Sequence, residues 1–191
     1  MNIIQSPSPN FYSRDGQKAD TLVIHITDGA HPGDLNWLTN PASQVSSHFL
    51  IAPGGPIHQL IQLQYAAWHA GRIDAPVAPL KKNSFGFYIN PNKYTVGIEV
   101  SLIPPALMDE WQLKSLHWLI KSHLKPLLNL SLDRQHIWGH WEVFSKKTCP
   151  ATINVDDLVR DLTLPPLSQG KEIKVIVDGE VLWSHQCPPT Q

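Results

Sequence analysis

The segment TLVIHIT, residues 21–27, is a short and almost continuous apolar run that is rich in β-branched residues. Such a run favours a strand that is buried on both faces, which requires a sheet covered by helices. The segment YTVGIEVS, residues 94–101, predicts a second strand between Asn-Pro-Asn and Pro-Pro boundaries. Residues 48–52 and 57–62 flank the turn Pro-Gly-Gly-Pro and predict a β-hairpin.

Helical periodicity is clearest over residues 109–128, where apolar residues recur at steps of three and four. The apolar stripe comprises Leu113, Leu116, Ile120, Leu124 and Leu127. Pro126 is expected to end or kink the last turn. A shorter helix is expected from about Asp34 to residues 43–47, and a final one over 155–162. Strands mixed with helices predict an α/β fold, a single domain with a central mixed β-sheet flanked by helices.

The end of the chain predicts a separate small element. Residues 163–170, TLPPLSQG, are typical of a linker, so residues 1–162 are expected to form the main domain. Within the tail, residues 171–191, two short apolar runs surround Asp178-Gly179, which is a strong signal for a short C-terminal β-hairpin. An isolated hairpin is marginal in water, so we expect this tail to pack on the main domain or on a second copy.

Charge and hydrophobicity exclude several classes of partner. A formal net charge of −1 gives no electrostatic footprint for nucleic acid. No segment approaches the roughly 18 apolar residues of a membrane span, so membrane insertion is not expected. The first residues lack the pattern of a signal peptide, which predicts synthesis as a cytoplasmic product. Cys149 and Cys187 are too few for a disulfide framework.

Two histidines and one cysteine are candidates for a metal site. His25 interrupts an apolar strand, where a polar ring needs a partner to offset its burial. His140 follows a strand-like segment, and Cys149 precedes Pro150 in a loop. Zinc accepts imidazole and thiolate ligands, and catalytic zinc sites use three protein ligands. Ordinary buried side chains remain an alternative, as does a thiol nucleophile, Cys149, with His140 as its base.

Two further side chains have the chemistry of amide hydrolysis. Glu99 lies in an otherwise apolar strand, and beside an activated water it can act as a general base. Its alternative is a glutamate on an edge strand that faces solvent. Lys147, two residues before Cys149, can stabilise a developing oxyanion, or it can be a solvated loop lysine as Lys146 is expected to be.

With these stretches in view, the chain resembles the zinc-dependent N-acetylmuramoyl-L-alanine amidases. That family includes phage endolysins, cell-wall recycling amidases and peptidoglycan recognition proteins. The matching stretches occur in the family's order and span residues 23–151. They are VIHIT, VSSHFLIAPGGPIHQLI, AAWHAG, TVGIEV and GHWEVFSKKTCPA.

The resemblance implies a role for each of these residues. His25, His140 and Cys149 match the zinc ligands. Glu99 and Lys147 match the catalytic base and the catalytic lysine.

The same resemblance implies that Trp68 and His69 line the substrate cleft. His48 and Glu142 are expected either to orient ligands or to be structural. Ser47 replaces a tyrosine that several members use, so the proton transfers fall to the glutamate and the lysine. Ala151 stands where the family often has glycine.

The implied reaction is hydrolysis of the bond between N-acetylmuramic acid and L-alanine in peptidoglycan by zinc-activated water. The chain is most similar to a phage endolysin, which reaches the cell wall after release. A non-catalytic peptidoglycan-binding protein and a cytoplasmic recycling amidase are the alternatives. A monomer or weak dimer is expected.

Overall fold

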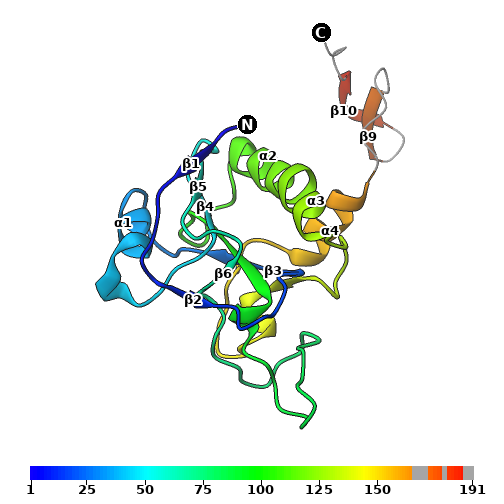
Figure 1. The fold of residues 1–191 in the computed structure, drawn as a ribbon. Coiled ribbons are helices and arrows are strands. Elements are labelled where there is room, and N and C mark those ends of the chain that lie inside the picture. Colours follow the sequence, from blue (N-terminus) through cyan, green and yellow to red (C-terminus); the bar gives the residue numbers. More distant parts are fainter. Residues whose placement is uncertain (165–171, 178–179, 187–191) are drawn as a thin grey trace.

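The computed structural model describes residues 1–164, 172–177 and 180–186 (Figure 1). Its centre is a six-stranded mixed sheet in the order β1-β5-β4-β7-β3-β8. The strands are β1 (Ile3–Gln5), β3 (Thr21–Ile26), β4 (Phe49–Ile51), β5 (Ile57–Gln59), β7 (Thr95–Val100) and β8 (Ile137–Gly139). Only β4 and β5 are antiparallel, joined by the predicted Pro-Gly-Gly-Pro turn, while the other pairs in this sheet are parallel. The α/β prediction is confirmed.

The two faces of this sheet have different roles. Side chains alternate between the faces of a strand. Leu22 and Ile24 of β3 therefore point, together with Ile98 of β7, into the main core. There they pack with buried side chains of the helices within residues 110–128 and 155–163. His25 and Glu99 point to the opposite face. The catalytic candidates thus lie on the face opposite the core that the helices of residues 110–128 and 155–163 cover.

The long predicted helix is one continuous helical segment with an irregular middle. It consists of α2 (Glu110–Trp118), a π-helical part (Leu119–Leu124) and α3 (Lys125–Leu128). Asp109 caps it by accepting a hydrogen bond from the backbone of Gln112. Proline lacks an N–H and clashes with the carbonyl four residues earlier, which accounts for the wide turn just before Pro126.

Two predictions about the helices need correction. In the apolar stripe, Leu113 and Leu127 are exposed, although the adjacent Gln112 is buried and the adjacent Leu128 packs against the core. These two leucines therefore lie on the solvent side of the helix. The shorter helix, α1 (Gly33–Thr39), ends well before residues 43–47, where Pro41 begins a 3₁₀ turn instead. Leu38 of α1 packs on the face of the sheet that carries His25 and Glu99. The predicted final helix, α4 (Val155–Thr163), packs in the main core on the opposite face.

Two small sheets complete the structure. β2 (Phe11–Ser13) pairs antiparallel with β6 (Tyr65–Ala67), a pairing that the sequence did not predict. β9 (Glu172–Val177) pairs antiparallel with β10 (Glu180–Gln186), as the Asp-Gly signal predicts. The hairpin tip, Cys187 and most of the expected linker lie outside the described residues, so the domain boundaries stay a prediction. No helix in the described ranges combines the length and the apolarity that crossing a bilayer requires.

Candidate metal centre and active site

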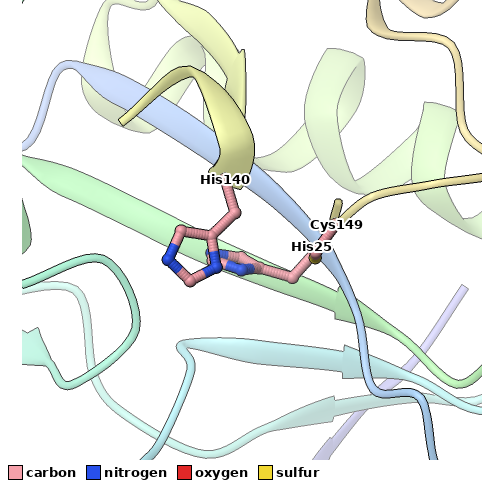
Figure 2. A group of neighbouring side chains, drawn as sticks. All are labelled: His25, His140 and Cys149. Atoms are coloured by element: carbon pink, nitrogen blue, oxygen red, sulfur yellow. The ribbon is translucent and has the colours of Figure 1, made fainter. Parts of the chain in front are cut away.

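His25, His140 and Cys149 converge on one point, although they come from distant parts of the chain (Figure 2). Their potential ligand atoms all lie within 4.8 Å of one another. Ligand atoms of a tetrahedral zinc site, with bonds of about 2.0–2.3 Å, are separated by roughly 3.3–3.8 Å. Two imidazoles and a thiol at this spacing fit a zinc ion, with a fourth position left for a small molecule.

Strand register brings the two histidines together. β3 and β8 are parallel neighbours, and Ile24 pairs with Gly139. The next residues of the two segments, His25 within β3 and His140 just after β8, therefore lie side by side, with ring centroids 4.6 Å apart. Glu142 supports this end of β8, because its carboxylate accepts the backbone N–H of Gly139 at 2.6 Å and contacts Arg134. Glu142 therefore stabilises the turn that presents His140.

The thiol of Cys149 is held against the end of β3. Its Sγ accepts a hydrogen bond from the backbone N–H of Ile26 at 3.1 Å. Burial raises the pKa of the thiol to about 12, and the charge of Glu99 adds to the shift. Burial also lowers the pKa of His140 to about 4, so no imidazolium is present to stabilise a thiolate. This environment disfavours the thiol-nucleophile alternative, since the thiolate is the reactive form. A bound metal ion deprotonates such a thiol outright.

Glu99 lies beside His25 on the neighbouring strand. The two residues are register partners, and His25 Nδ1 lies 4.0 Å from the Glu99 carboxylate. The edge-strand alternative is wrong, because β7 lies between β4 and β3. The Glu99 side chain is only 14% exposed, and its Oε2 has no hydrogen-bond partner within the described part of the chain.

The environment of Glu99 disfavours its charge. Burial raises the pKa of this carboxyl to about 8, Asp34 adds to the shift, and Lys147 opposes it. A buried carboxylate with a free oxygen and a perturbed pKa, facing a pocket, has the properties of a general acid–base.

A pocket of about 500 Å³ opens over these groups. Its lining includes Trp68, His69 and Lys147, all three of which the sequence assigned to the active site. Lys147 is exposed and electrostatically coupled to both candidate histidine ligands. The neighbouring Lys146 is exposed instead, and its Nζ lies 3.8 Å from Oδ2 of Asp74. This position matches its expected role as a solvated loop lysine.

Two pocket residues were missed by the sequence analysis. Asp34 and Trp37 of α1 line the pocket, and Trp37 is 57% exposed. An acidic residue in the first turn of a short helix, followed by a tryptophan, was a weak signal, because their spacing matches no motif. Asp34 is buried and accepts hydrogen bonds from Thr27 and from the backbone of Leu35.

The segment before β4 has a structural role. Ser47 is fully buried and donates a hydrogen bond to the Phe49 carbonyl, so its hydroxyl does not face the pocket. The ring of His48 accepts the N–H of Gly97 and lies 3.1 Å from the Tyr65 carbonyl oxygen. His48 therefore links β7 to β6 and does not lie in the pocket lining.

Comparison with known proteins agrees with this geometry. The family model described as N-acetylmuramoyl-L-alanine amidase matches residues 15–152, which contain every candidate ligand. The chain belongs to this amidase family. The N-acetylmuramoyl-L-alanine amidase A of Achromobacter lyticus is 31% identical over 93 residues. That match covers 48% of this chain and 42% of the relative, so it spans less than half of either protein.

Several solved structures share the amidase fold. A selenomethionine derivative of AmpD superposes with a TM-score of 0.64 at 22% identity, covering 85% of this chain and 94% of that one. A mutant endolysin from Bacillus subtilis gives 0.62 at 23% identity, with 85% and 99% covered. The AmiD amidase of E. coli, in complex with anhydro-N-acetylmuramic acid-L-Ala-D-γ-Glu-L-Lys, gives 0.60 at 22% identity, with 83% and 62% covered.

Proposed function

We propose that the chain hydrolyses the amide bond between N-acetylmuramic acid and L-alanine in peptidoglycan. The observation that carries the proposal is the convergence of His25, His140 and Cys149 beside the buried carboxyl of Glu99. Membership of the amidase family supports it, and so does the muropeptide substrate named for the structurally similar AmiD.

The proposed cofactor is one zinc ion, held by His25, His140 and Cys149. When bound, zinc acts as a Lewis acid and lowers the pKa of a coordinated water to about 7. The mixed nitrogen and sulfur donor set supports zinc over magnesium or calcium, which prefer oxygen ligands.

Glu99 and Lys147 supply the remaining chemistry. Glu99 accepts a proton from the water that attacks the carbonyl carbon, and it returns that proton to the nitrogen of L-alanine as the carbon–nitrogen bond breaks. The products are the free carboxyl group of muramic acid and a free amino terminus. The Lys147 ammonium, at the pocket wall, stabilises the negative charge that develops on the carbonyl oxygen.

Aromatic side chains of the pocket support a glycopeptide substrate. Trp68 and Trp37 both line the pocket, together with the candidate metal ligands. Flat aromatic rings of this kind suit contact with the apolar faces of sugar rings. We therefore propose that the muramic acid end of the substrate contacts these tryptophans.

The biological role that we propose is that of a lytic endolysin, which acts on the cell wall after release from the cytoplasm where it is made. The cysteine ligand supports this role, because the resemblance associates cysteine at this position with phage amidases. Recycling enzymes usually have aspartate there. A non-catalytic receptor is disfavoured, since such family members typically lack the third ligand.

The test is digestion of purified peptidoglycan. Zinc-loaded protein is expected to release new alanine amino termini without new reducing sugar ends, and a chelator is expected to abolish the release until zinc is restored. Wall binding without new amino termini would instead support the receptor alternative, and activity that survives metal removal would contradict the zinc mechanism.

A further inference from the structure

A short chain of hydrogen bonds runs from His25 away from the candidate metal site. His25 Nε2 lies 3.0 Å from His69 Nδ1, and His69 Nε2 lies 3.1 Å from the hydroxyl oxygen of Thr95. That hydroxyl donates to the carbonyl oxygen of Pro91 at 2.8 Å. Thr95 is fully buried, so water does not compete for its hydroxyl.

The hydrogen bond from Thr95 to Pro91 determines which atom is the donor in each of the other two hydrogen bonds. A threonine hydroxyl has one proton, and here Pro91 accepts it, so His69 Nε2 must donate to Thr95. The ring nitrogens of His69 contact His25 and Thr95 and no carboxylate among the described residues, so this ring is neutral and carries its one proton on Nε2. His25 must likewise be neutral to bind a metal ion, so it too carries one proton. His69 Nδ1 is therefore an acceptor, and the proton between the rings belongs to His25 Nε2.

We infer that His69 is a positioning residue for the metal site, which with Thr95 fixes His25 in the tautomer that offers Nδ1 to an ion. The inference rests on the zinc site of the proposed function. Nδ1 is the nitrogen that faces Glu99, and the Nε2 side is occupied by His69. A histidine ligand bound to a metal through one nitrogen commonly donates the proton of its other nitrogen to a neighbour, which fixes ring orientation.

Contacts from Gly97 and Asn92 fix the position of the His69 ring and its backbone. A methyl group on Gly97 would lie 2.6 Å from His69 Cγ, so only glycine at this point of β7 leaves room for the imidazole. The carboxamide oxygen of Asn92 accepts the backbone N–H groups of His69 and Ala70. Backbone and side chain of His69 are thus both anchored to the turn that contains Pro91 and Asn92.

This role differs from the substrate contact that the resemblance implied. His69 borders the pocket, but its two ring nitrogens are engaged with His25 and Thr95. Neither nitrogen is left to bind a substrate. Its effect on activity is therefore expected to pass through His25.

The first experiment observes the tautomers directly in the zinc-free full chain. Long-range proton–nitrogen NMR correlations distinguish a protonated ring nitrogen from an unprotonated one, and loss of signals in the His69→Phe variant assigns that ring. The expected result is a proton on Nε2 of both His25 and His69. A proton on Nδ1 of His25 would overturn the inference, and this readout does not depend on metal or activity.

The second experiment measures zinc affinity by competition with a chromophoric chelator. Thr95→Val removes the acceptor for His69 at nearly constant shape and is expected to weaken binding about 10-fold, within the range typical of outer ligand partners. Thr21→Val is the matched control, because Thr21 is the register partner of Thr95 on β3, and among the described residues its hydroxyl donates to Asp20 and not to the metal site. The control is expected to bind zinc as the wild type does.

Substitutions of His69 separate a hydrogen-bond role from a packing role. His69→Phe fills the space without an acceptor and is expected to lose at least as much zinc affinity as Thr95→Val. His69→Asn places a carboxamide oxygen near the position of Nδ1 and is expected to restore part of it. Gly97→Ala, which displaces the ring, is expected to resemble His69→Phe.

Failure of this inference is distinguishable from failure of the proposed function. If the wild type binds zinc and both Thr95→Val and His69→Phe bind it equally well, the positioning role is wrong while the amidase proposal stands. If the wild type binds no zinc, the amidase mechanism is wrong, and the NMR experiment still decides the tautomer.

Discussion

At the scale of single residues, burial shifts the pKa values of groups in the site. Oε2 of Glu99 is buried without a hydrogen-bond partner among the described residues, and burial raises the pKa of the Cys149 thiol to about 12. The unpaired oxygen of Glu99 costs stability in the absence of a ligand, because an unpaired buried polar atom is destabilising. Shifted pKa values of this kind are expected at a site of chemistry.

Glu99→Gln tests the proposed proton transfers. The amide is nearly isosteric but accepts no proton at neutral pH, so turnover on peptidoglycan is expected to fall about 10²-fold or more. Zinc content, measured in parallel, is expected to stay at the wild-type level, because Glu99 is not one of the three ligands. Near-normal turnover in a zinc-loaded Glu99→Gln variant would remove Glu99 from the mechanism.

The same substitution has a pH-dependent effect on stability in zinc-free protein. The pKa of Glu99 is raised in the folded state to about 8, from an ordinary value of 4.5, so the folded protein binds a proton more tightly than the unfolded chain does. The contribution of Glu99 to stability is therefore present at low pH and is lost as pH rises from about 4.5 to 8. Glu99→Gln is expected to gain stability relative to the wild type over that range, measured as the difference in Tm at pH 5 and pH 8. An unchanged difference would contradict the burial of this carboxyl.

At the scale of elements, register decides which side chains meet. β3 pairs with β7 on one side and β8 on the other, which places His25 next to Glu99 and His140 immediately after the β8 pairing. A shift of one residue would turn either strand's functional side chain into the helix-covered core. Leu22, Ile24 and Ile26 pack in the main core and Val23 packs on the opposite face, so burial on both faces of β3 holds the register and with it the site.

The long helix offers a direct test of which part packs on the sheet. Leu119→Ala removes a fully buried side chain and is expected to lower the free energy of unfolding by about 2–5 kcal/mol. Leu127→Ala is the matched control on the same helix, where the side chain is 60% exposed, and a change within about 0.5 kcal/mol is expected. Denaturant titration measures both. Equal losses would mean that the helix packs along its whole apolar stripe.

At the scale of the whole molecule, the candidate ligands connect distant segments of the chain. His25 lies near the start of the described domain and Cys149 near its end, and the intervening chain contributes the rest of the sheet. An ion bound by all three ligands would stabilise only the folded arrangement, since the unfolded chain does not hold them together.

Zinc is therefore expected to raise the Tm of the whole domain. At a free concentration one hundred times the Kd, linkage gives about 2.7 kcal/mol of added stability. Cys149→Ser is expected to lose most of this increase, while Cys149→Asp, which supplies the carboxylate ligand associated with recycling enzymes, is expected to keep part of it. Differential scanning calorimetry with and without zinc provides the measurement. An equal increase in Cys149→Ser would exclude Cys149 as a ligand.

The sequence alone predicted the features that depend on local pattern. These features are the apolar runs of β3 and β7, the turn between β4 and β5, and the periodicity of the long helix. Each depends on interactions between residues that are close in sequence. The resemblance to the amidase family identified the candidate residues together, because the matching motifs occur in the same order along the chain as in the family. The convergence of His25, His140 and Cys149 was expected on that basis, and the structure adds its geometry.

Only the tertiary structure decided features that depend on partners distant in sequence. Whether Glu99 lay on an edge or a central strand depended on which strands flank β7. Leu127 is exposed although the adjacent Leu128 packs against the core, because the rest of the fold covers only one side of the helix. The hydrogen bonds that orient His69 involve residues 26 and 44 positions away. Local pattern carries no information about such contacts, because burial and hydrogen-bond direction are set by what packs against a residue from elsewhere in the chain.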